Sequence, residues 1–463
     1  MATESPLRSI FRRYDIRGIV GTTLTEDIAA RIGRAFAELL RARGARELVL
    51  ARDARLSSPA LARAFGQAVR DGGIDLVDLG LVPTPLAYYA TCALDVPHAA
   101  IVTGSHNPAE YNGLKLVVDG LPLHGDALQD LYRRVCAARD WQGRRGGYRP
   151  LDLRDRYVAE VTGRLRLARP LRVAVDCGNG VAGVLAPRLL RALGCEVTVL
   201  FGEPDGRFPN HHPNPSEPAN LEALQALLGS GRFDLGLAFD GDADRLGVLD
   251  ERGRVQWPDR QMMLFADELL RRKPGATVLY DVKSSWHLGR MVEALGGTAR
   301  LVPSGHSLIR QAMAESGAEL GGELAGHLYF RDGWYGFDDA LYTAARLLAL
   351  LSRQPAPASA VFGRLPDTVS TPELLLPFES DYRLRQVMRA LARRREAFDG
   401  LRIVTLDGLR VEYPDGWGLV RASNTTPSLS LRFEAENPAA LAQIRDRFDR
   451  VLRQVVPDLH LPA

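Results

Sequence analysis

The chain has 463 residues, of which 46% are hydrophobic and 25% charged, and this length is enough for about three or four domains. Its 59 basic and 56 acidic residues leave a formal net charge of only +3, which argues against a nucleic-acid-binding protein. No run of about 18 apolar residues occurs, and the four cysteines form no C-x-x-C pair. We therefore expect a soluble cytoplasmic protein with reduced thiols and without a nucleic-acid or membrane partner.

The first 150 residues alternate short apolar strands with amphipathic helices. The expected strands lie at 48–50, 74–79 and 99–102, and the expected helices begin at Thr25 and Ala60 and after Pro85. The aromatic and basic stretch at 11–18 is expected to be a loop, and the Gly/Arg-rich stretch at 143–150 a linker. This alternation predicts a mostly parallel α/β sheet.

The same alternation then begins twice more. The second unit has expected strands at 171–176, 196–200 and 235–239 and a helix at 184–193, and the third has helices at 260–272 and 286–295 and strands at 277–280 and 299–302. The last part changes character, with strands expected at 401–406, 409–413, 418–421 and 429–434 before a helix at 438–455. We predict three successive related α/β domains with mixed, mostly parallel sheets, followed by a smaller α+β domain, at 1–150, 151–254, 255–366 and 367–463.

Each of the first three units places an apolar strand directly before a loop of small and polar residues, where α/β proteins carry their chemistry. In the first unit this loop spans residues 103–108 and puts Ser105 at the tip of a turn held by a rigid scaffold. With Gly104 before it and His106 behind it, this serine could be attacked or modified. An ordinary turn serine fits the same short pattern. The loop therefore indicates a functional site only in combination with the motifs that follow it.

Three aspartates, Asp240, Asp242 and Asp244, alternate with glycine and alanine directly after an apolar strand. Such carboxylates repel one another unless a cation holds them, and hard oxygen ligands with small spacers suit Mg²⁺. An EF-hand loop does not fit, because its sixth position needs glycine and carries Arg245 here. A solvated acidic turn does not fit the apolar residues 246–249 that follow. The pattern therefore predicts a magnesium site.

Two further polar loops lie in the third and fourth units. Glu323 and His327 flank a Gly-rich loop, where the carboxylate could accept hydrogen bonds from sugar hydroxyls and the histidine could donate to phosphate or move a proton. Residues 421–427 bring a guanidinium, hydroxyls and an amide into one turn, a set of donors suited to a phosphate dianion. Taken alone, the first pair also fits an ordinary loop, and the second fits a polar hairpin turn.

Together, the motifs T-G-S-H-N-P at 103–108, D-G-D-A-D-R at 240–245, G-E…G-H at 322–327 and R-A-S-N-T-T-P at 421–427 resemble the α-D-phosphohexomutases, above all the bacterial phosphomannomutase/phosphoglucomutases. The resemblance runs from Tyr14 to the final helix. It implies four domains around a central active-site cleft, and an isomerase that moves a phosphoryl group between carbons 1 and 6 of mannose and glucose phosphates. It also implies a hexose phosphate substrate, bound Mg²⁺, a hexose 1,6-bisphosphate intermediate, and a monomer or weak homodimer.

The resemblance also implies roles for single residues. Ser105 would carry the phosphoryl group and share Mg²⁺ with Asp240, Asp242 and Asp244. The groups around the transferring phosphoryl would be Arg17, His106, Arg245 and Lys115, the last a candidate proton acceptor. The sugar would meet Glu323 and the loop through Ala325 to His327, with Tyr14, Lys283 and His306 nearby. The phosphate that does not react would be bound by Arg421, Ser423, Asn424 and Thr425.

One position departs from the family. The sugar loop usually reads G-E-x-S-G-H, and this chain has Ala325 where the serine is expected, which bears on substrate choice and efficiency. The alternative within the enzymes is a phosphoglucosamine mutase, whose distal loop usually reads S-G-T-E-P, whereas residues 423–427 read S-N-T-T-P. The alternative from another class is a phosphosugar-binding protein without turnover, and the presence of Ser105 and all three aspartates argues against it.

Overall fold

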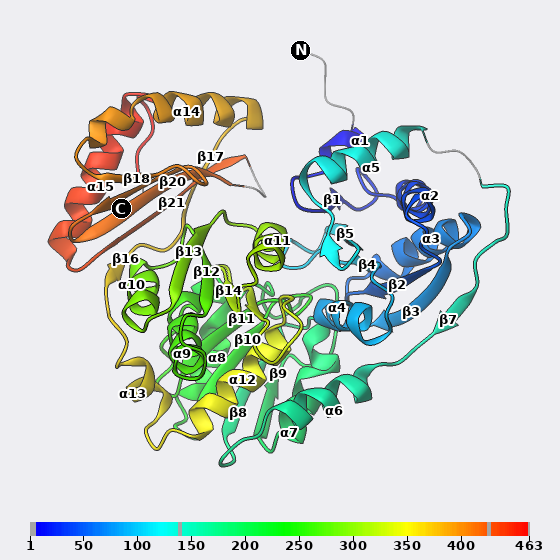
Figure 1. The fold of residues 1–463 in the computed structure, drawn as a ribbon, viewed down its shortest axis with the longest axis horizontal. Coiled ribbons are helices and arrows are strands. Elements are labelled where there is room, and N and C mark those ends of the chain that lie inside the picture. Colours follow the sequence, from blue (N-terminus) through cyan, green and yellow to red (C-terminus); the bar gives the residue numbers. More distant parts are fainter. Residues whose placement is uncertain (1–5, 138–140, 424–426, 462–463) are drawn as a thin grey trace.

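The computed structural model describes residues 6–137, 141–423 and 427–461, which form four units, each built on its own sheet. Figure 1 shows the first three units, coloured blue to yellow, in contact with one another, and the last unit, orange to red, beside the third. The predicted fold class, three α/β units followed by a smaller α+β unit, is confirmed. The domain boundaries given above stay predictions.

The first unit is a seven-stranded sheet in the order β1-β5-β4-β2-β3-β7, with β6 paired to β5. Its strands are β1 (Ile16–Ile19), β2 (Glu47–Arg52), β3 (Asp75–Leu81), β4 (Ala99–Val102), β5 (Tyr111–Val118), β6 (Leu121–Pro122) and β7 (Tyr148–Pro150). Its helices are α1 (Pro6–Ser9), α2 (Glu26–Ala42), α3 (Ser58–Asp71), α4 (Thr84–Ala93) and α5 (Gly125–Ala137). Thr25 begins α2 as predicted, because its side chain accepts a hydrogen bond from the Ile28 N–H.

Two predictions for the first unit are wrong. Residues 16–18, expected in a loop, belong to β1, which pairs antiparallel with β5, and the expected linker at 143–150 contributes β7, which pairs parallel with β3. All residues of β7 are exposed. An edge strand of this kind joins the sheet through backbone pairing and the Tyr148 hydroxyl, which donates to Asp78 at 2.9 Å, and buries no apolar face. The sequence therefore carries no apolar pattern that would indicate it.

The second and third units have the sheet orders β11-β10-β8-β9 and β13-β12-β14-β15, each with one antiparallel edge strand on parallel neighbours. The second unit contains α6 (Arg154–Arg164), β8 (Arg172–Asp176), η1 (Val181–Val184), α7 (Ala186–Ala192), β9 (Glu196–Leu200), η2 (Pro218–Leu221), α8 (Glu222–Leu228), β10 (Leu235–Phe239) and β11 (Leu246–Asp250). The third contains α9 (Pro258–Arg272), β12 (Thr277–Asp281), α10 (Trp286–Ala294), β13 (Thr298–Val302), α11 (His306–Ser316), β14 (Leu320–Gly322), β15 (Leu328–Phe330), α12 (Ala340–Ser352) and α13 (Ala358–Phe362).

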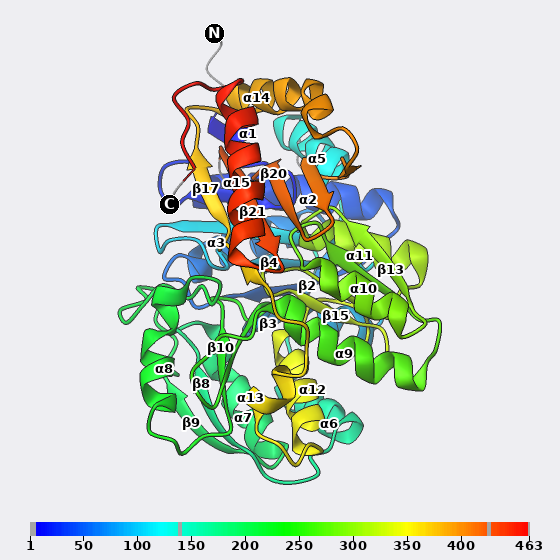
Figure 2. The same ribbon diagram turned by 90° about the vertical axis from the view of Figure 1, so that its left-hand side faces the viewer.

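The C-terminal unit has the sheet order β16-β21-β20-β19-β18, with β17 paired to β21. Its elements are β16 (Val369–Ser370), β17 (Leu374–Pro377), α14 (Asp381–Arg393), η3 (Arg395–Phe398), β18 (Arg402–Val404), β19 (Leu409–Tyr413), β20 (Gly416–Ala422), β21 (Ser428–Ala435) and α15 (Pro438–Arg453). Both helices pack on the sheet through one apolar cluster, and Figure 2 shows α15 in front of β21.

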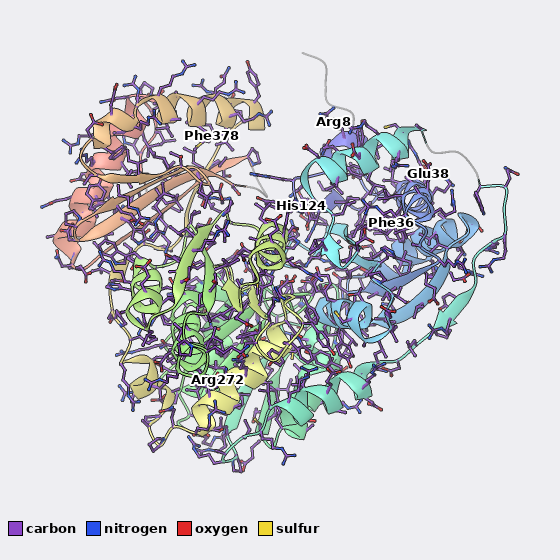
Figure 3. The ribbon with its side chains drawn as sticks, viewed as in Figure 1. Arg8, Phe36, Glu38, His124, Arg272 and Phe378 are labelled. Carbon is purple, nitrogen blue, oxygen red and sulfur yellow. The ribbon has the colours of Figure 1, made fainter. Side chains whose placement is uncertain are left out.

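One apolar core joins the first three units. It includes Tyr88 of α4, Tyr157 of α6 and Leu347 of α12, whereas the C-terminal unit has a core of its own. A polar contact also links the first and third units. His124, labelled in Figure 3, has its Nε2 2.8 Å from Oε1 of Gln311 in α11. Within the described ranges, no helix is both long and apolar enough to cross a membrane.

Candidate active site

Ser105 lies in a buried loop directly after β4. Its backbone adopts φ +48°, in the left-handed region that costs a non-glycine residue free energy. The Ser105 N–H donates to Thr103 Oγ1 at 2.8 Å, and its hydroxyl donates to Asp240 Oδ2 at 2.9 Å. Because the second unit covers the loop, the serine is only 1% exposed, unlike an ordinary turn serine at a surface.

The aspartates Asp240, Asp242 and Asp244 follow β10 and are fully buried; we call them the acidic triad. Asp240 Oδ1 accepts hydrogen bonds from the backbone N–H groups of Asp244 and Arg245, both at 3.1 Å, so the loop folds around this carboxylate. Lys115 of β5 lies 2.8 Å from Asp242 and also contacts Asp244. Residues from two units thus form one charged cluster around Ser105 Oγ.

The charges of this cluster shift the pKa values of its members. Burial, together with the other two carboxylates, raises the pKa of Asp240 well above its usual range. Burial alone would lower the pKa of Lys115, but Asp242 and Asp244 outweigh it and raise that pKa well above its ordinary value. Lys115 is therefore positively charged at neutral pH, and the triad around it carries an excess of negative charge.

The acidic triad fits a metal ion. Its three ligand oxygens all lie within 4.8 Å of one another. Among the described residues, Asp242 Oδ1 and Asp244 Oδ1 are buried and have no hydrogen-bond partner. A buried carboxylate oxygen without a donor costs free energy, and a hard divalent cation supplies the missing partner. The donor set is the one predicted from the sequence.

Arg17 and His106 lie beside the serine loop. Arg17 donates to the Gly104 carbonyl, and its Nε lies 2.8 Å from Asp15. His106 Nδ1 lies 3.3 Å from Ser105 Oγ. Burial lowers the pKa of His106 well below its usual value, so this histidine is neutral at pH 7 and Arg17 supplies the positive charge on this side.

Glu323 follows β14 and is buried beside residues of the first unit. Its Oε2 accepts the Gly305 N–H at 2.9 Å, while its Oε1 has no hydrogen-bond partner in the described part of the chain. Burial raises the pKa of Glu323 and lowers that of His306 to about 3. The Tyr14 hydroxyl donates to the Ser304 carbonyl at 3.1 Å, which brings the first unit to the same loop. The carboxylate oxygen that is left over can accept a ligand hydroxyl.

His327 links Arg245 to Asp338, a buried carboxylate that the sequence analysis missed. Arg245 Nε donates to His327 Nε2 at 2.9 Å, and His327 Nδ1 lies 3.0 Å from Asp338 Oδ2. This arrangement favours the tautomer with its proton on Nδ1 and leaves Nε2 as the acceptor. In the same loop, the Ala325 carbonyl accepts a hydrogen bond from Ser216 Oγ at 3.3 Å.

The cations expected near the sugar and its unreacting phosphate each face a carboxylate. Lys283 Nζ lies 2.9 Å from Glu373, and Arg421 Nε lies 3.0 Å from Asp407. Arg421 belongs to β20 rather than to the turn that follows it. We call Lys283 and Arg421 the distal cations. They come from the third and fourth units, away from the contacts of Ser105.

The other predicted distal residues, Ser423, Asn424 and Thr425, follow β20 in the sequence. The Ser423 N–H donates to the Ser428 carbonyl at 2.8 Å, next to the pairing of β20 with β21. Asn424 and Thr425 lie outside the described residues. The structure therefore joins Ser105, the acidic triad, Lys115, Arg245 and His327 through a chain of direct contacts, with Arg17 and His106 beside them.

Two of the residues that the sequence analysis missed, Asp53 and Arg55, lie directly under the serine loop. Asp53 follows β2 just as Asp240 follows β10, so the rule of polar residues after strands could have found it. Neither Arg55 nor Asp338 has a comparable signal, because their partners are far away in the sequence.

Sequence-family models described as phosphoglucomutase/phosphomannomutase match most of the chain. The alpha/beta/alpha domains I, II and III match residues 8–140, 155–253 and 257–369, and the C-terminal domain matches residues 383–451.

Full-length relatives and a solved structure agree with these matches. A phosphomannomutase/phosphoglucomutase of Pseudomonas aeruginosa is 45% identical over 454 residues, covering 98% of this chain and 97% of that protein. A phosphoglucomutase of Neisseria gonorrhoeae is 46% identical over 449 residues, covering 96% and 97%. The crystal structure of a phosphoglucomutase/phosphomannomutase family protein from Burkholderia thailandensis has a TM-score of 0.93 and 49% identity, covering 98% of this chain and 99% of that one. The resemblance inferred from the four motifs is thereby confirmed, and the chain belongs to the phosphoglucomutase/phosphomannomutase family.

Proposed function

We propose that this chain interconverts the 1- and 6-phosphates of mannose and of glucose, through a phosphoserine at Ser105 and a hexose 1,6-bisphosphate. The observation that carries the proposal is the position of Ser105 Oγ, 2.9 Å from Asp240, in a cluster where Lys115 lies 2.8 Å from Asp242. Phosphoryl transfer depends mainly on charge neutralisation and positioning, which such a cluster supplies. The relatives are named as hexose phosphate mutases, in agreement with the predicted isomerase activity.

In the proposed first step, the 6-hydroxyl oxygen of a hexose 1-phosphate attacks the phosphorus carried by Ser105. A new O–P bond forms, the bond from phosphorus to Ser105 Oγ breaks, the hydroxyl proton passes to a base, and Oγ regains a proton. The bisphosphate then turns around and returns its 1-phosphoryl group to Ser105 by the reverse chemistry. Phosphoryl groups and protons balance over the cycle, so no co-reactant is consumed.

The two proton transfers are assigned to different residues. Lys115 lies 2.8 Å from Asp242 and also contacts Asp244, and this pairing with two carboxylates favours a proton donor to Ser105 Oγ over the accepting role that the resemblance implied. His327 is the better candidate for the acceptor once Arg245, whose Nε donates to His327 Nε2 at 2.9 Å, turns to the phosphoryl oxygens and frees that nitrogen. Asp338, 3.0 Å from His327 Nδ1, would then stabilise the imidazolium that forms.

The remaining charges around the phosphoryl group are assigned as follows. Arg17 and Arg245 would bind its oxygens through charge-assisted hydrogen bonds, and neutral His106 would donate one more. The acidic triad and the phosphate on Ser105 would hold Mg²⁺, which would neutralise charge on the phosphoryl oxygens when bound. A phosphoserine beside the triad brings together about five negative charges, more than Lys115 alone offsets.

Sugar recognition is assigned to the third unit and its neighbours. Glu323 would accept hydrogen bonds from sugar hydroxyls, with Tyr14, His306 and Lys283 around it. Arg421 and residues 423–425 would bind the phosphate that does not react. One distal phosphate site then serves both orientations of the bisphosphate, because the two steps use the same reacting site.

A coupled assay tests the proposal. Glucose 1-phosphate and mannose 1-phosphate are each supplied with Mg²⁺ and a trace of the matching 1,6-bisphosphate, and formation of the 6-phosphate is followed. Turnover of both is expected. Preferred turnover of glucosamine 1-phosphate would favour the phosphoglucosamine mutase alternative, and binding of all three without turnover would favour a phosphosugar-binding protein.

A further inference from the structure

A buried arginine beneath the serine loop has no role in the chemistry described above. Arg55 lies in the turn between β2 and α3 and is 1% exposed. Its guanidinium donates to backbone carbonyls of the loop at 104–111, namely those of Ser105 at 2.9 Å, Pro108 at 2.6 Å, Tyr111 at 2.8 Å, and Asn107. One planar guanidinium therefore donates hydrogen bonds to carbonyls on both sides of the loop tip.

Asp53 also contacts the backbone of the serine loop and Arg55. Its Oδ2 accepts the Gly104 N–H at 2.9 Å and lies 3.3 Å from Arg55 Nε, while its Oδ1 accepts the Arg55 N–H at 3.0 Å. The Asp53–Arg55 pair thus binds backbone donors and acceptors of the serine loop. The Ser105 side chain is contacted instead by Asp240 of the acidic triad.

The packing around the serine loop leaves no room for a side chain at Gly104 or Gly241. A Cβ atom on Gly104 would lie 2.1 Å from Arg55 Nε, and one on Gly241 would lie 2.4 Å from the Ser105 carbonyl oxygen. From the second unit, the ring centroid of Phe208 lies 5.2 Å from the guanidinium carbon. Arg55 therefore sits where the serine loop meets the unit that carries the acidic triad.

We infer that Arg55 is a positioning residue for the phosphoryl transfer: it holds the backbone of residues 104–111 in the shape that sets Ser105 Oγ against Asp240. The inference rests on the proposed role of Ser105. With its φ of +48°, Ser105 needs contacts from outside the loop to keep its conformation. A guanidinium provides donors in a fixed plane for several carbonyls at once, a geometry that a lysine ammonium does not reproduce.

The substitution Arg55→Lys tests this inference, with Arg63→Lys on the exposed face of α3 as the matched control. We expect kcat of Arg55→Lys to fall about ten- to a hundredfold, and KM to change less than about threefold, because misplaced reacting groups slow the reaction more than they weaken binding. Hydrogen exchange of the amides at 104–111 should become faster, while exchange in α2 stays as in the wild type. Arg63→Lys should match the wild type in every measurement.

Two results would overturn the inference. One is an Arg55→Lys protein with wild-type kcat, even if its melting temperature falls, since Arg55 would then serve stability alone. The other is wild-type exchange at 104–111. If Arg55→Lys does not fold, Arg55→Gln takes its place, because it keeps a planar donor group but cannot reach all four carbonyls, and wild-type kcat there overturns the inference equally. A wild-type chain that turns over no hexose phosphate would defeat the proposed function, while the exchange comparison would still decide whether Arg55 holds the loop.

Discussion

The acidic triad and the distal cations both concentrate charge in the active site, but they balance it in different ways. At the triad, three buried carboxylates face one lysine, Lys115, and two of their oxygens have no hydrogen-bond partner among the described residues. At the distal end, Arg421 faces Asp407 at 3.0 Å and Lys283 faces Glu373 at 2.9 Å, so each cation has a carboxylate of its own.

This difference indicates what each end needs from its ligand. The triad lacks positive charge, so a bound cation completes it. The distal end is already balanced, and an incoming phosphate has to displace a carboxylate. Burial would raise the pKa of Glu373, but Lys283 outweighs it and holds that pKa at about 2, so the carboxylate stays ionised and competes with phosphate at neutral pH. If the distal cations bind phosphate as proposed, such competition would weaken that binding and favour release when a bisphosphate turns around.

The largest effect is expected from removing the Ser105 hydroxyl at the triad end. Ser105→Ala keeps the triad and Lys115 but has no oxygen to carry the phosphoryl group, so kcat should fall about a thousandfold or more. Intact-mass measurement of the wild type should include a species that is one phosphoryl group heavier, and the variant should lack it. Substantial activity in Ser105→Ala would contradict the covalent route.

Removal of the metal should have the next largest effect on turnover. It should also distinguish the acidic triad, which is expected to need a cation, from the distal cations, which are not. Chelation should lower turnover about a hundredfold or more, and Mg²⁺ should restore it, because the triad lacks positive charge without a cation. Asp242→Asn should require more Mg²⁺ for half-maximal activity. Asp407→Asn, its counterpart at the distal end, should leave the Mg²⁺ requirement unchanged. Full activity in excess EDTA would show that the acidic triad does not need a bound metal ion for turnover.

A smaller effect, on binding more than on rate, is expected at the distal end. Arg421→Ala should raise KM about tenfold or more for both 1-phosphates, since a hydrogen bond between a guanidinium and phosphate contributes about 1.5–3 kcal/mol. It should also release more bisphosphate into solution during turnover, measured by chromatography of the reaction mixture. Arg402→Ala, on the exposed part of β18, is the control. Unchanged KM values would mean that the C-terminal unit takes no part in phosphate binding.

The smallest effect is expected between the two ends, in the sugar loop. A serine at position 325 would add one hydrogen bond to the sugar, worth about 0.5–1.5 kcal/mol, while Glu323 Oε1 already offers an acceptor to the sugar. Ala325→Ser should therefore raise kcat/KM about two- to tenfold for both sugars, which differ only at carbon 2. A gain for one sugar with a loss for the other would make Ala325 a specificity determinant instead.

Most of the fold could be predicted from the alternation of apolar strands and amphipathic helices. The strands β4, β9, β10 and β19 have the bounds expected from the sequence, because β4 and β10 are short apolar runs and β9 and β19 alternate apolar with polar residues. The edge strand β7 carries no such run. Helix α14 was missed although Leu384, Val387 and Leu391 have helical spacing, because the arginines between them resemble a solvated basic segment.

The candidate site was predictable where its residues form local motifs. Ser105 and the acidic triad lie in loops directly after apolar strands, and the structure brings these loops into contact. Arg55 and Asp338 could not be found in this way. Arg55 acts on backbone carbonyls 50 or more residues later in the chain, and Asp338 is placed against His327 by the antiparallel bridge between Tyr329 and Asp338.

The apolar core shared by the first three units has a consequence for unfolding. Side chains from β2 through α13 belong to this one cluster, whereas the C-terminal unit is held together by a cluster of its own. A unit that cannot expose its core without exposing those of its neighbours melts together with them. The parts of the first three units that share this cluster should therefore open together, whereas α2, α3 and α5 of the first unit pack in a second cluster of their own. The C-terminal unit, which carries Arg421, meets the third unit through a small cluster that includes Trp286 and Trp417, and Arg410 donates to the carbonyls of Val282 and Ser284. Its separation from the third unit should therefore break these buried contacts and leave the shared core intact.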